Sequence, residues 1–131
     1  MSHVYSEKQL DHYLAIMDRV AELWVQQFPE RATYSPGYWH LFMGLYKNRK
    51  YAITKGEAAE FLTAAQIKSP ATRAKVIAGA IKLGYVSEQK SNVDKRANLV
   101  KMTPKLEQKM QEYLSASLQA MSEALQSINK G

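Results

Sequence analysis

The sequence contains no cysteine among its 131 residues. Disulfide bonds, thiolate metal sites and cysteine nucleophiles are therefore excluded. Long apolar runs are also missing: no uncharged stretch approaches the roughly 20 residues that span a bilayer, so no membrane segment is expected. The first seven residues lack the basic and apolar regions of a signal peptide. A cytoplasmic location is therefore expected.

Residue patterns that are typical of catalytic and metal sites are scarce as well. The three histidines, His3, His12 and His40, do not stand at metal-ligand spacing from one another. The six glycines are scattered and form no phosphate-binding loop, and no serine stands in a nucleophile-elbow motif. We therefore expect no enzyme activity, no catalytic residue, no metal and no cofactor.

Positive charge is concentrated in the middle of the chain. The net charge is +6, and residues 47–109 carry +9, whereas residues 1–46 carry −2 and residues 110–131 carry −1. A basic block between slightly acidic ends indicates a surface for a polyanion in the middle and a different role for the ends. A basic surface that only faces solvent is the alternative.

Hydrophobic periodicity predicts amphipathic helices at both ends of the chain. Apolar residues recur at steps of three and four over residues 10–28 and again over residues 106–128, and a shorter helix is expected over 36–46. Ser6 and Gln9 have the spacing of a capping box at the first helix start. The two terminal helices hold more apolar residues than a monomer can hide, so a homodimer is expected.

The central segment changes from helical to strand periodicity. It is predicted to fold, in order, as a short strand at 51–53, helices at 55–65 and 70–83, and hairpin strands at 85–89 and 99–102. Ser69 and Pro70 combine an N-cap with an N1 proline, and Gly84 is placed to end the second of these helices. This order is typical of a winged helix-turn-helix, so the predicted fold is mainly α with a small β wing.

The helix at 70–83 and the tip of the hairpin carry the side chains that fit double-stranded DNA. In a winged helix the second helix of the pair enters the major groove, while a basic hairpin tip reaches phosphates or the minor groove. The predicted DNA-binding residues are Ser69, Pro70, Thr72, Arg73, Lys75, Lys90, Asp94, Lys95 and Arg96. The small residues Ala78 and Gly79 would let the helix lie deep in a groove. Plain solvated helix residues are the alternative for Arg73 and Lys75.

Residues 72–86, followed by residues 94–96 and residues 99–105, resemble the recognition helix, wing and post-wing stretch of the MarR (multiple-antibiotic-resistance-regulator) family. These are dimeric bacterial transcription factors. The wing of the family carries an Asp-x-Arg signature, then an apolar strand, then Thr-Pro at the next helix start. The matching residues are Asp94, Arg96, Thr103 and Pro104. The resemblance covers residues 53–107 closely.

The resemblance implies a single domain in which residues 1–46 and 104–131 form the helical dimerisation region and residues 47–103 form the winged-helix lobe. It implies a homodimeric repressor on a pseudo-palindromic operator. It also implies that Arg96 enters the minor groove and that Asp94 orients a nearby arginine through a charge-assisted bond. A turn-forming role without an ionic partner is the alternative for Asp94.

The family often binds small aromatic acids, so the resemblance implies a small aromatic effector. Tyr34 and Tyr38 are the candidate ligand-binding residues, whereas the helical spacing of Trp39, Phe42 and Tyr46 is typical of core. A winged-helix module for protein–protein assembly, without specific DNA binding, is the alternative function.

Overall fold

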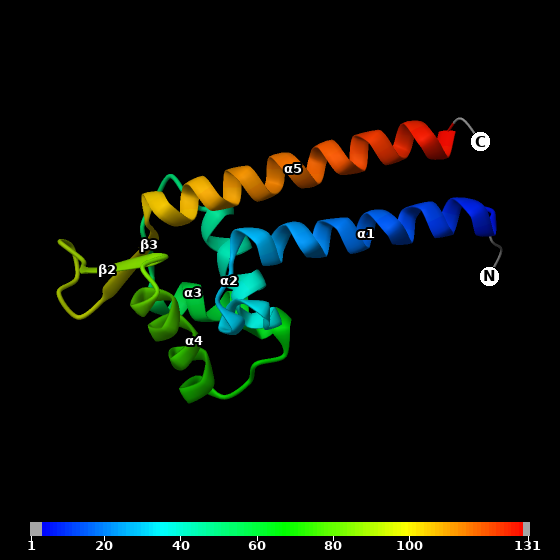
Figure 1. Ribbon diagram of the computed structural model, residues 1–131. Helices are drawn as coiled ribbons and strands as arrows, with labels where there is room; N and C mark the ends of the chain where they lie inside the picture. Colours follow the sequence, from blue (N-terminus) through cyan, green and yellow to red (C-terminus); the bar gives the residue numbers. More distant parts are fainter. Residues whose placement is uncertain (1–3, 130–131) are drawn as a thin grey trace. The chain divides into compact units, whose positions relative to one another are not determined.

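The computed structural model describes residues 4–129 and is mainly helical (Figure 1). In chain order its elements are α1 (Glu7–Gln27), the 3₁₀ turn η1 (Arg31–Tyr34), α2 (Pro36–Lys47), β1 (Ile53–Thr54), α3 (Lys55–Phe61), the 3₁₀ turn η2 (Leu62–Ala65), α4 (Pro70–Lys82), β2 (Val86–Lys90), β3 (Asn98–Met102) and α5 (Pro104–Asn129). The predicted mainly α fold with a small β wing is confirmed.

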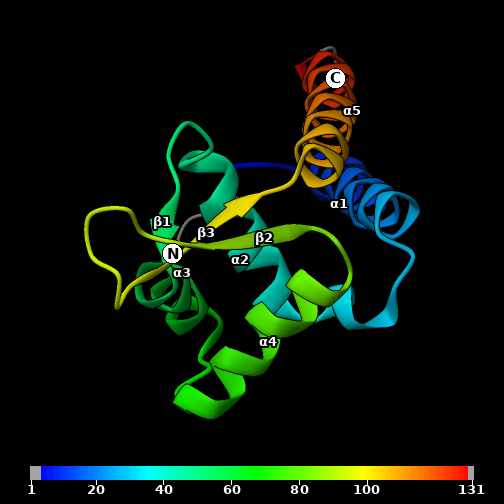
Figure 2. The same ribbon diagram turned by 90° about the vertical axis from the view of Figure 1, so that its left-hand side faces the viewer.

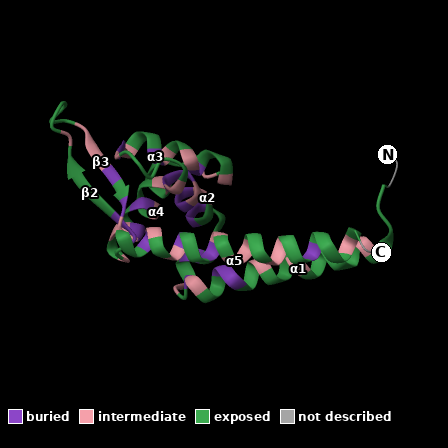
Figure 3. Ribbon diagram, turned by 90° about the horizontal axis from the view of Figure 1, so that it is seen from above, coloured by how far each residue is buried: buried purple, intermediate pink, exposed green. Residues whose placement is uncertain are grey.

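The chain forms two compact units. The terminal-helix unit combines the residues up to Pro29 with those from Gln111 onward, and the central unit is Glu30–Met110. The resemblance groups residues 30–46 with the terminal helices. The structure instead groups them with the central unit, because α2 packs on η1, α3, η2 and α4. Helix α2 is the most buried helix of this unit, as the purple ribbon in Figure 3 shows.

Helices α1 and α5 lie side by side in the terminal-helix unit (Figures 1 and 3). The Trp24 ring packs edge-on against Tyr113 with 5.0 Å between ring centroids, and Gln27 Nε2 donates to the Glu112 carboxylate at 3.0 Å. Of the 21 residues of α1, only Leu23 and Trp24 are buried. Most of the apolar stripe that defines this helix in the sequence is therefore not covered by α5.

Local capping starts three of the helices, and the caps of α1 and α4 are those that the sequence predicts. Ser6 and Gln9 form a reciprocal capping box at α1, and Thr54 and Glu57 form one at α3. At α4 the Ser69 hydroxyl accepts from the Thr72 backbone N–H at 3.3 Å. Each cap satisfies an N–H group that the first helical turn leaves without a partner.

The sheet has three antiparallel strands in the order β1-β3-β2. Ile53 of β1 pairs with Val100 of β3, which pairs on its other side with Glu88 of β2. An ion pair between Lys55 and Glu88 further joins the start of α3 to the wing. An isolated two-stranded hairpin is only marginally stable in water, so the third strand and the burial of Val100 attach the wing to the central unit.

Helix α3 is shorter than the predicted 55–65 because its last turn tightens into η2. Gln66 then adopts a left-handed backbone conformation with φ 63°. This conformation reverses the chain toward Ser69 and the start of α4. Gly84 also has a positive φ, of 82°, which matches its predicted place after the end of α4.

The close approach of α2 and α4 depends on Gly79. A Cβ atom built on Gly79 would overlap the hydroxyl oxygen of Tyr38, while the next nearest atom, Tyr38 Cζ, would lie 3.6 Å away. Tyr38 is itself buried, with 5% of its surface exposed, and its ring packs edge-on against Phe42. The expectation that Gly79 opens the outer side of α4 to a groove is therefore wrong, because Gly79 is half-buried and faces α2.

Gly79→Ala is expected to lower the free energy of unfolding by about 1–3 kcal/mol, because overpacking forces the buried ring to shift. The double variant Gly79→Ala with Tyr38→Phe is expected to be more stable than Gly79→Ala alone, since the overlapping atom is gone. Chemical denaturation of the two single variants and the double variant measures this coupling. Strictly additive effects would contradict the proposed contact.

Candidate nucleic-acid interface

Helix α4 has one face that turns away from the protein. Its exposed residues beyond Pro70 are Ala71, Thr72, Ala74, Lys75, Ala78 and Lys82. Four of them, Ala71, Lys75, Ala78 and Lys82, recur at steps of four, three and four residues along one side of the helix. On the opposite face Ile77 and Ala80 are buried. Two small and two basic residues therefore form a narrow, positively charged ridge. Ala71 and Lys82 were not predicted from the sequence, although steps of four, three and four residues from Ala71 identify the ridge.

Arg73 lies on the inward face of α4, one turn before Ile77. It is half-buried, its Nη2 lies 3.5 Å from the Lys68 carbonyl oxygen, and its Nε is buried with no hydrogen-bond partner among residues 4–129. It borders a cavity of about 380 Å³ between α3 and α4. The structure thus separates Arg73 from the exposed Thr72 and Lys75, with which the sequence pattern groups it.

Ser69 and Pro70 are exposed at the N-terminus of α4. The Ser69 side chain caps the helix through the Thr72 N–H, and Pro70 occupies the first turn, where a missing N–H costs no hydrogen bond. Both residues therefore shape the start of α4 and leave its first turn open to solvent.

The wing tip is basic and exposed. Lys90, Asp94, Lys95 and Arg96 are all exposed, and Figure 2 shows the loop between β2 and β3 projecting beyond the helices of the central unit. The Asp94 carboxylate accepts from the Arg96 backbone N–H at 3.0 Å, and the Asp94 backbone N–H donates to the Ser91 hydroxyl at 3.1 Å. Asp94 therefore holds the backbone of the tip as a turn-forming residue.

Tyr85 lies shortly after the end of α4, beyond Leu83 and Gly84, and is fully buried. Its hydroxyl donates to the Glu30 carboxylate, with 2.6 and 2.9 Å to the two oxygens. The Phe42 ring packs edge-on against its ring, and Lys105 Nζ lies 4.6 Å from the ring centroid. Burial, the hydrogen bond to Glu30 and the negative charge of Glu30 all raise the pKa of Tyr85, so this hydroxyl stays protonated and remains a donor.

Thr103, which precedes α5, and Lys105 in the first turn of α5 hold the end of α4. The Thr103 hydroxyl donates to the Gly84 carbonyl at 2.7 Å, and Lys105 Nζ donates to the Leu83 carbonyl at 3.1 Å. The Thr103 backbone N–H donates to the Tyr85 carbonyl at 3.0 Å. We call these contacts, together with the bond from Tyr85 to Glu30, the Tyr85 junction.

The candidate ligand-binding phenols have different environments. Tyr34 is 47% exposed on η1, whereas Tyr38 is buried against Phe42 and α4. Burial, followed by the charge of Glu30, raises the pKa of Tyr38. Of the three aromatic residues expected in the core, Phe42 is fully buried, but Trp39 is 41% exposed. The core position of this helix turn is taken by Tyr38, because α2 is rotated so that Tyr38 faces α4.

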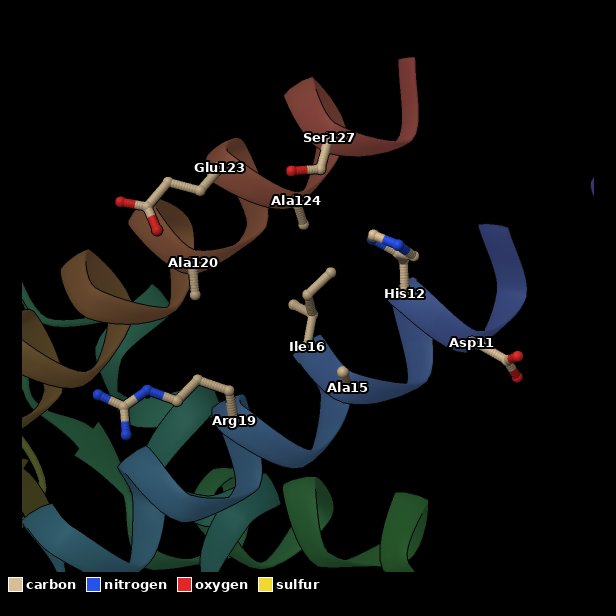
Figure 4. Close-up of a pocket in the computed structure, with 9 residues that line it drawn as sticks. All are labelled: Asp11, His12, Ala15, Ile16, Arg19, Ala120, Glu123, Ala124 and Ser127. Atoms are coloured by element: carbon tan, nitrogen blue, oxygen red, sulfur yellow. The ribbon is translucent and has the colours of Figure 1, made fainter. Parts of the chain in front are cut away.

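In the terminal-helix unit an open groove of about 500 Å³ runs between α1 and α5 (Figure 4). Ile16 of α1 points toward Ala120 and Ala124 of α5, and the charged side chains Arg19 and Glu123 lie at its sides. The apolar part of the groove is thus formed by Ile16 and by alanines of both helices. Nothing in the described part of the chain fills it.

The described residues contain no group of three or more histidine, aspartate or glutamate side chains placed to hold a metal ion. His3, one of the three histidines of the sequence, lies outside the described residues. No helix within residues 4–129 is long and apolar enough to cross a membrane.

No protein-family model and no curated protein matches the sequence. Solved structures do match the fold. The chain is similar to S. aureus MepR in a MepR–DNA complex, with TM-score 0.65 and 15% identity over 90% of this chain and 88% of that one. It is also similar to the heme sensor protein PefR from Streptococcus agalactiae in complex with heme, with TM-score 0.57 and 24% identity over 90% and 71% of the two chains.

A third similar structure is a MarR-like transcription regulator from Bacillus cereus, with TM-score 0.56 and 17% identity over 88% of this chain and 75% of that one. At these identities the matches establish the fold, which is the winged helix-turn-helix expected from the sequence.

Proposed function

We propose that this chain is a MarR-family transcription regulator that binds double-stranded DNA as a homodimer. The observation that carries the proposal is the exposed ridge of α4, presented on a fold that is shared with a protein solved on DNA. The basic wing tip and the +9 charge of residues 47–109 support the same function. The wing motif Asp94-x-Arg96 and the helix start Thr103-Pro104 add the sequence resemblance.

In this proposal α4 enters the major groove with Thr72 and Lys75 toward base edges, because both are exposed in its first two turns. The alanines at 71 and 78 keep the ridge thin enough to approach the bases. Arg96 at the wing tip reaches the neighbouring minor groove or its phosphates. Arg73 faces α3 instead and contributes to the position of the helix start rather than to base contacts.

The homodimer is supported by the apolar surface of α1 and α5. Large apolar side chains remain exposed along both helices, namely Leu10, Tyr13, Leu14, Met17 and Val25 of α1 and Leu118 and Leu125 of α5. Leu118 is the most exposed of these side chains, at 68%. A second copy of the chain would cover this surface and fill the groove of Figure 4 with matching side chains.

Sedimentation at micromolar concentration is expected to show a species of about twice the 14.9 kDa of the chain. Leu118→Glu is expected to shift this species toward the monomer, because a charge at a covered apolar position weakens the interface. Gln126→Glu, which adds the same charge at an exposed position of α5, is the control. A wild-type protein that sediments only as a monomer contradicts the dimer.

The test of DNA binding is selection of duplexes from a random library, followed by affinity measurements on the selected site across a salt series. We expect an enriched sequence and a log–log salt slope of about −0.9 per phosphate contact. Lys75→Ala is expected to weaken specific binding by roughly 1–3 kcal/mol. Lys50→Ala is the charge-matched control, since residues 48–52 lie on the other side of α2 from α4 (Figures 1 and 2).

An absence of enriched sequences, with a shallow salt slope, would favour the protein–protein assembly module instead. Equal losses of affinity in Lys75→Ala and Lys50→Ala would show that the protein is attracted to DNA only through its positive charge, without base reading by α4. The comparison of these two variants therefore separates base reading by α4 from the general effect of positive charge.

Arg96→Ala is expected to reduce affinity on most duplexes and to lower the salt slope by about 0.9 for each phosphate that the wing tip no longer neutralises. Asp94→Asn keeps the Oδ1 acceptor for the Arg96 N–H and removes a negative charge, so it is expected to bind at least as tightly as the wild type. Asp94→Ala removes the acceptor and is expected to weaken binding by loosening the tip. A wild-type salt slope in Arg96→Ala would show that Arg96 does not contact DNA.

A further inference from the structure

We propose that Val93, at the tip of the wing, is a specificity-determining residue that packs into the minor groove of DNA and selects A·T base pairs there. The inference rests on the proposed function and deepens it, because it names the side chain with which the wing reads bases and the bases that it selects. The carrying observation is that Val93 is 98% exposed, more than any other large apolar side chain that the structure describes, and stands on a basic hairpin.

The backbone around Val93 is held by hydrogen bonds within the tip. The Ser91 hydroxyl accepts from the Val93 N–H at 3.2 Å and from the Asp94 N–H at 3.1 Å. The Asp94 carboxylate accepts from the Arg96 N–H at 3.0 Å, and the Ser91 N–H donates to the Ala97 carbonyl at 3.0 Å across the base of the loop. A tip ordered in this way presents Val93 in a defined position before DNA arrives, which lowers the entropic cost of binding.

The side chain of Val93 is not explained by the turn in which it stands. Turns favour glycine, proline, asparagine, aspartate and serine, whereas β-branched residues favour strands. Only the backbone N–H of Val93 takes part in the hydrogen bonds of the tip, and at 98% exposure its methyl groups lie outside the core. A polar residue would serve the turn equally well, so the apolar side chain points to a contact made outside the protein.

The charges around Val93 identify DNA as the partner. Residues 90–96 carry three basic side chains, Lys90, Lys95 and Arg96, against the single carboxylate of Asp94, and all four are exposed. The loop that carries them projects beyond the helices of the central unit (Figure 2). Phosphates line both sides of the minor groove, so cations placed before and after Val93 in the chain match its two walls.

The minor groove distinguishes A·T from G·C pairs chiefly through the amino group of guanine, which is a hydrogen-bond donor at the groove floor. A valine methyl group that covers this donor offers no acceptor, so the donor loses its bond to water without a replacement. A·T pairs lack the amino group, and A-tracts narrow the groove so that the sugar walls come closer to an inserted side chain. An apolar side chain in this groove therefore favours A·T pairs.

Val93→Thr is the variant that isolates the apolar contact. It keeps the branched shape and replaces one methyl group with a hydroxyl, which can accept from the guanine amino group or donate to the acceptors of an A·T pair. Val93→Ala removes both γ-methyl groups. Asn92→Thr introduces the same side chain at the neighbouring exposed position and is the control. None of these variants changes the net charge, so their salt slopes are expected to equal that of the wild type.

The experiment compares versions of the selected duplex in which short blocks outside the base pairs read by Lys75 carry A·T, G·C or inosine·cytosine pairs. Inosine lacks the amino group of guanine but keeps its major-groove edge, so it separates reading in the two grooves. For the wild type and Asn92→Thr, we expect G·C under the wing to cost about tenfold in affinity relative to A·T, and inosine·cytosine to cost less than about threefold. For Val93→Thr and Val93→Ala the G·C cost is expected to fall below about threefold.

Unchanged discrimination against G·C in both Val93 variants would overturn the proposal, and its loss in Arg96→Ala alone would assign the preference to Arg96 instead. Inosine·cytosine pairs that cost as much as G·C would place the reading in the major groove and would overturn the proposal too. An equal decrease in affinity for all three duplexes in Val93→Thr would show that Val93 only shapes the tip. Each of these results leaves the proposed function intact, whereas a wild type that selects no duplex would overturn the proposed function itself.

Discussion

The hydrogen bond from the buried Tyr85 hydroxyl to Glu30 joins two segments of the central unit that lie 55 residues apart in the sequence. Tyr85 lies shortly after the end of α4, and Glu30 is the first residue of the unit. Lys105 and Thr103 reach the same place from the start of α5. The three segments supply complementary chemical groups at this place in the fold. The tyrosine supplies a donor and an apolar ring, the glutamate an acceptor, and the lysine a cation for the ring face and the last carbonyls of α4.

Once its end is held in this way, α4 divides its residues between two roles. The inward face packs Ile77 and Ala80, and the absence of a side chain at Gly79 lets Tyr38 of α2 approach closely. The outward face keeps only small and basic residues, so it contributes little to the core. Changes on the outward face can therefore alter what the helix contacts without loss of stability, whereas changes on the inward face cannot.

The terminal-helix unit is arranged differently, because α1 and α5 bury little of each other's apolar stripe. A stable monomer would place those side chains against a third element, and none of the described residues supplies one. The proposed second copy supplies it and places two α4 helices on one DNA molecule. The same apolar residues then determine both the assembly and the number of half-sites that it reads.

The sequence by itself determined the class of fold, the helix starts, the hairpin and the exposed basic tip. These follow from local chemistry, because caps such as Ser69, a left-handed glycine such as Gly84 and periods of two or 3.6 act within a few residues. Only the tertiary structure decided which way α2 and α4 face. Their apolar stripes are short, and neighbouring positions differ by only about 100° around a helix axis. Contacts between distant segments therefore decided that Arg73 turns inward, that Tyr38 is buried in place of Trp39, and that Tyr85 meets Glu30.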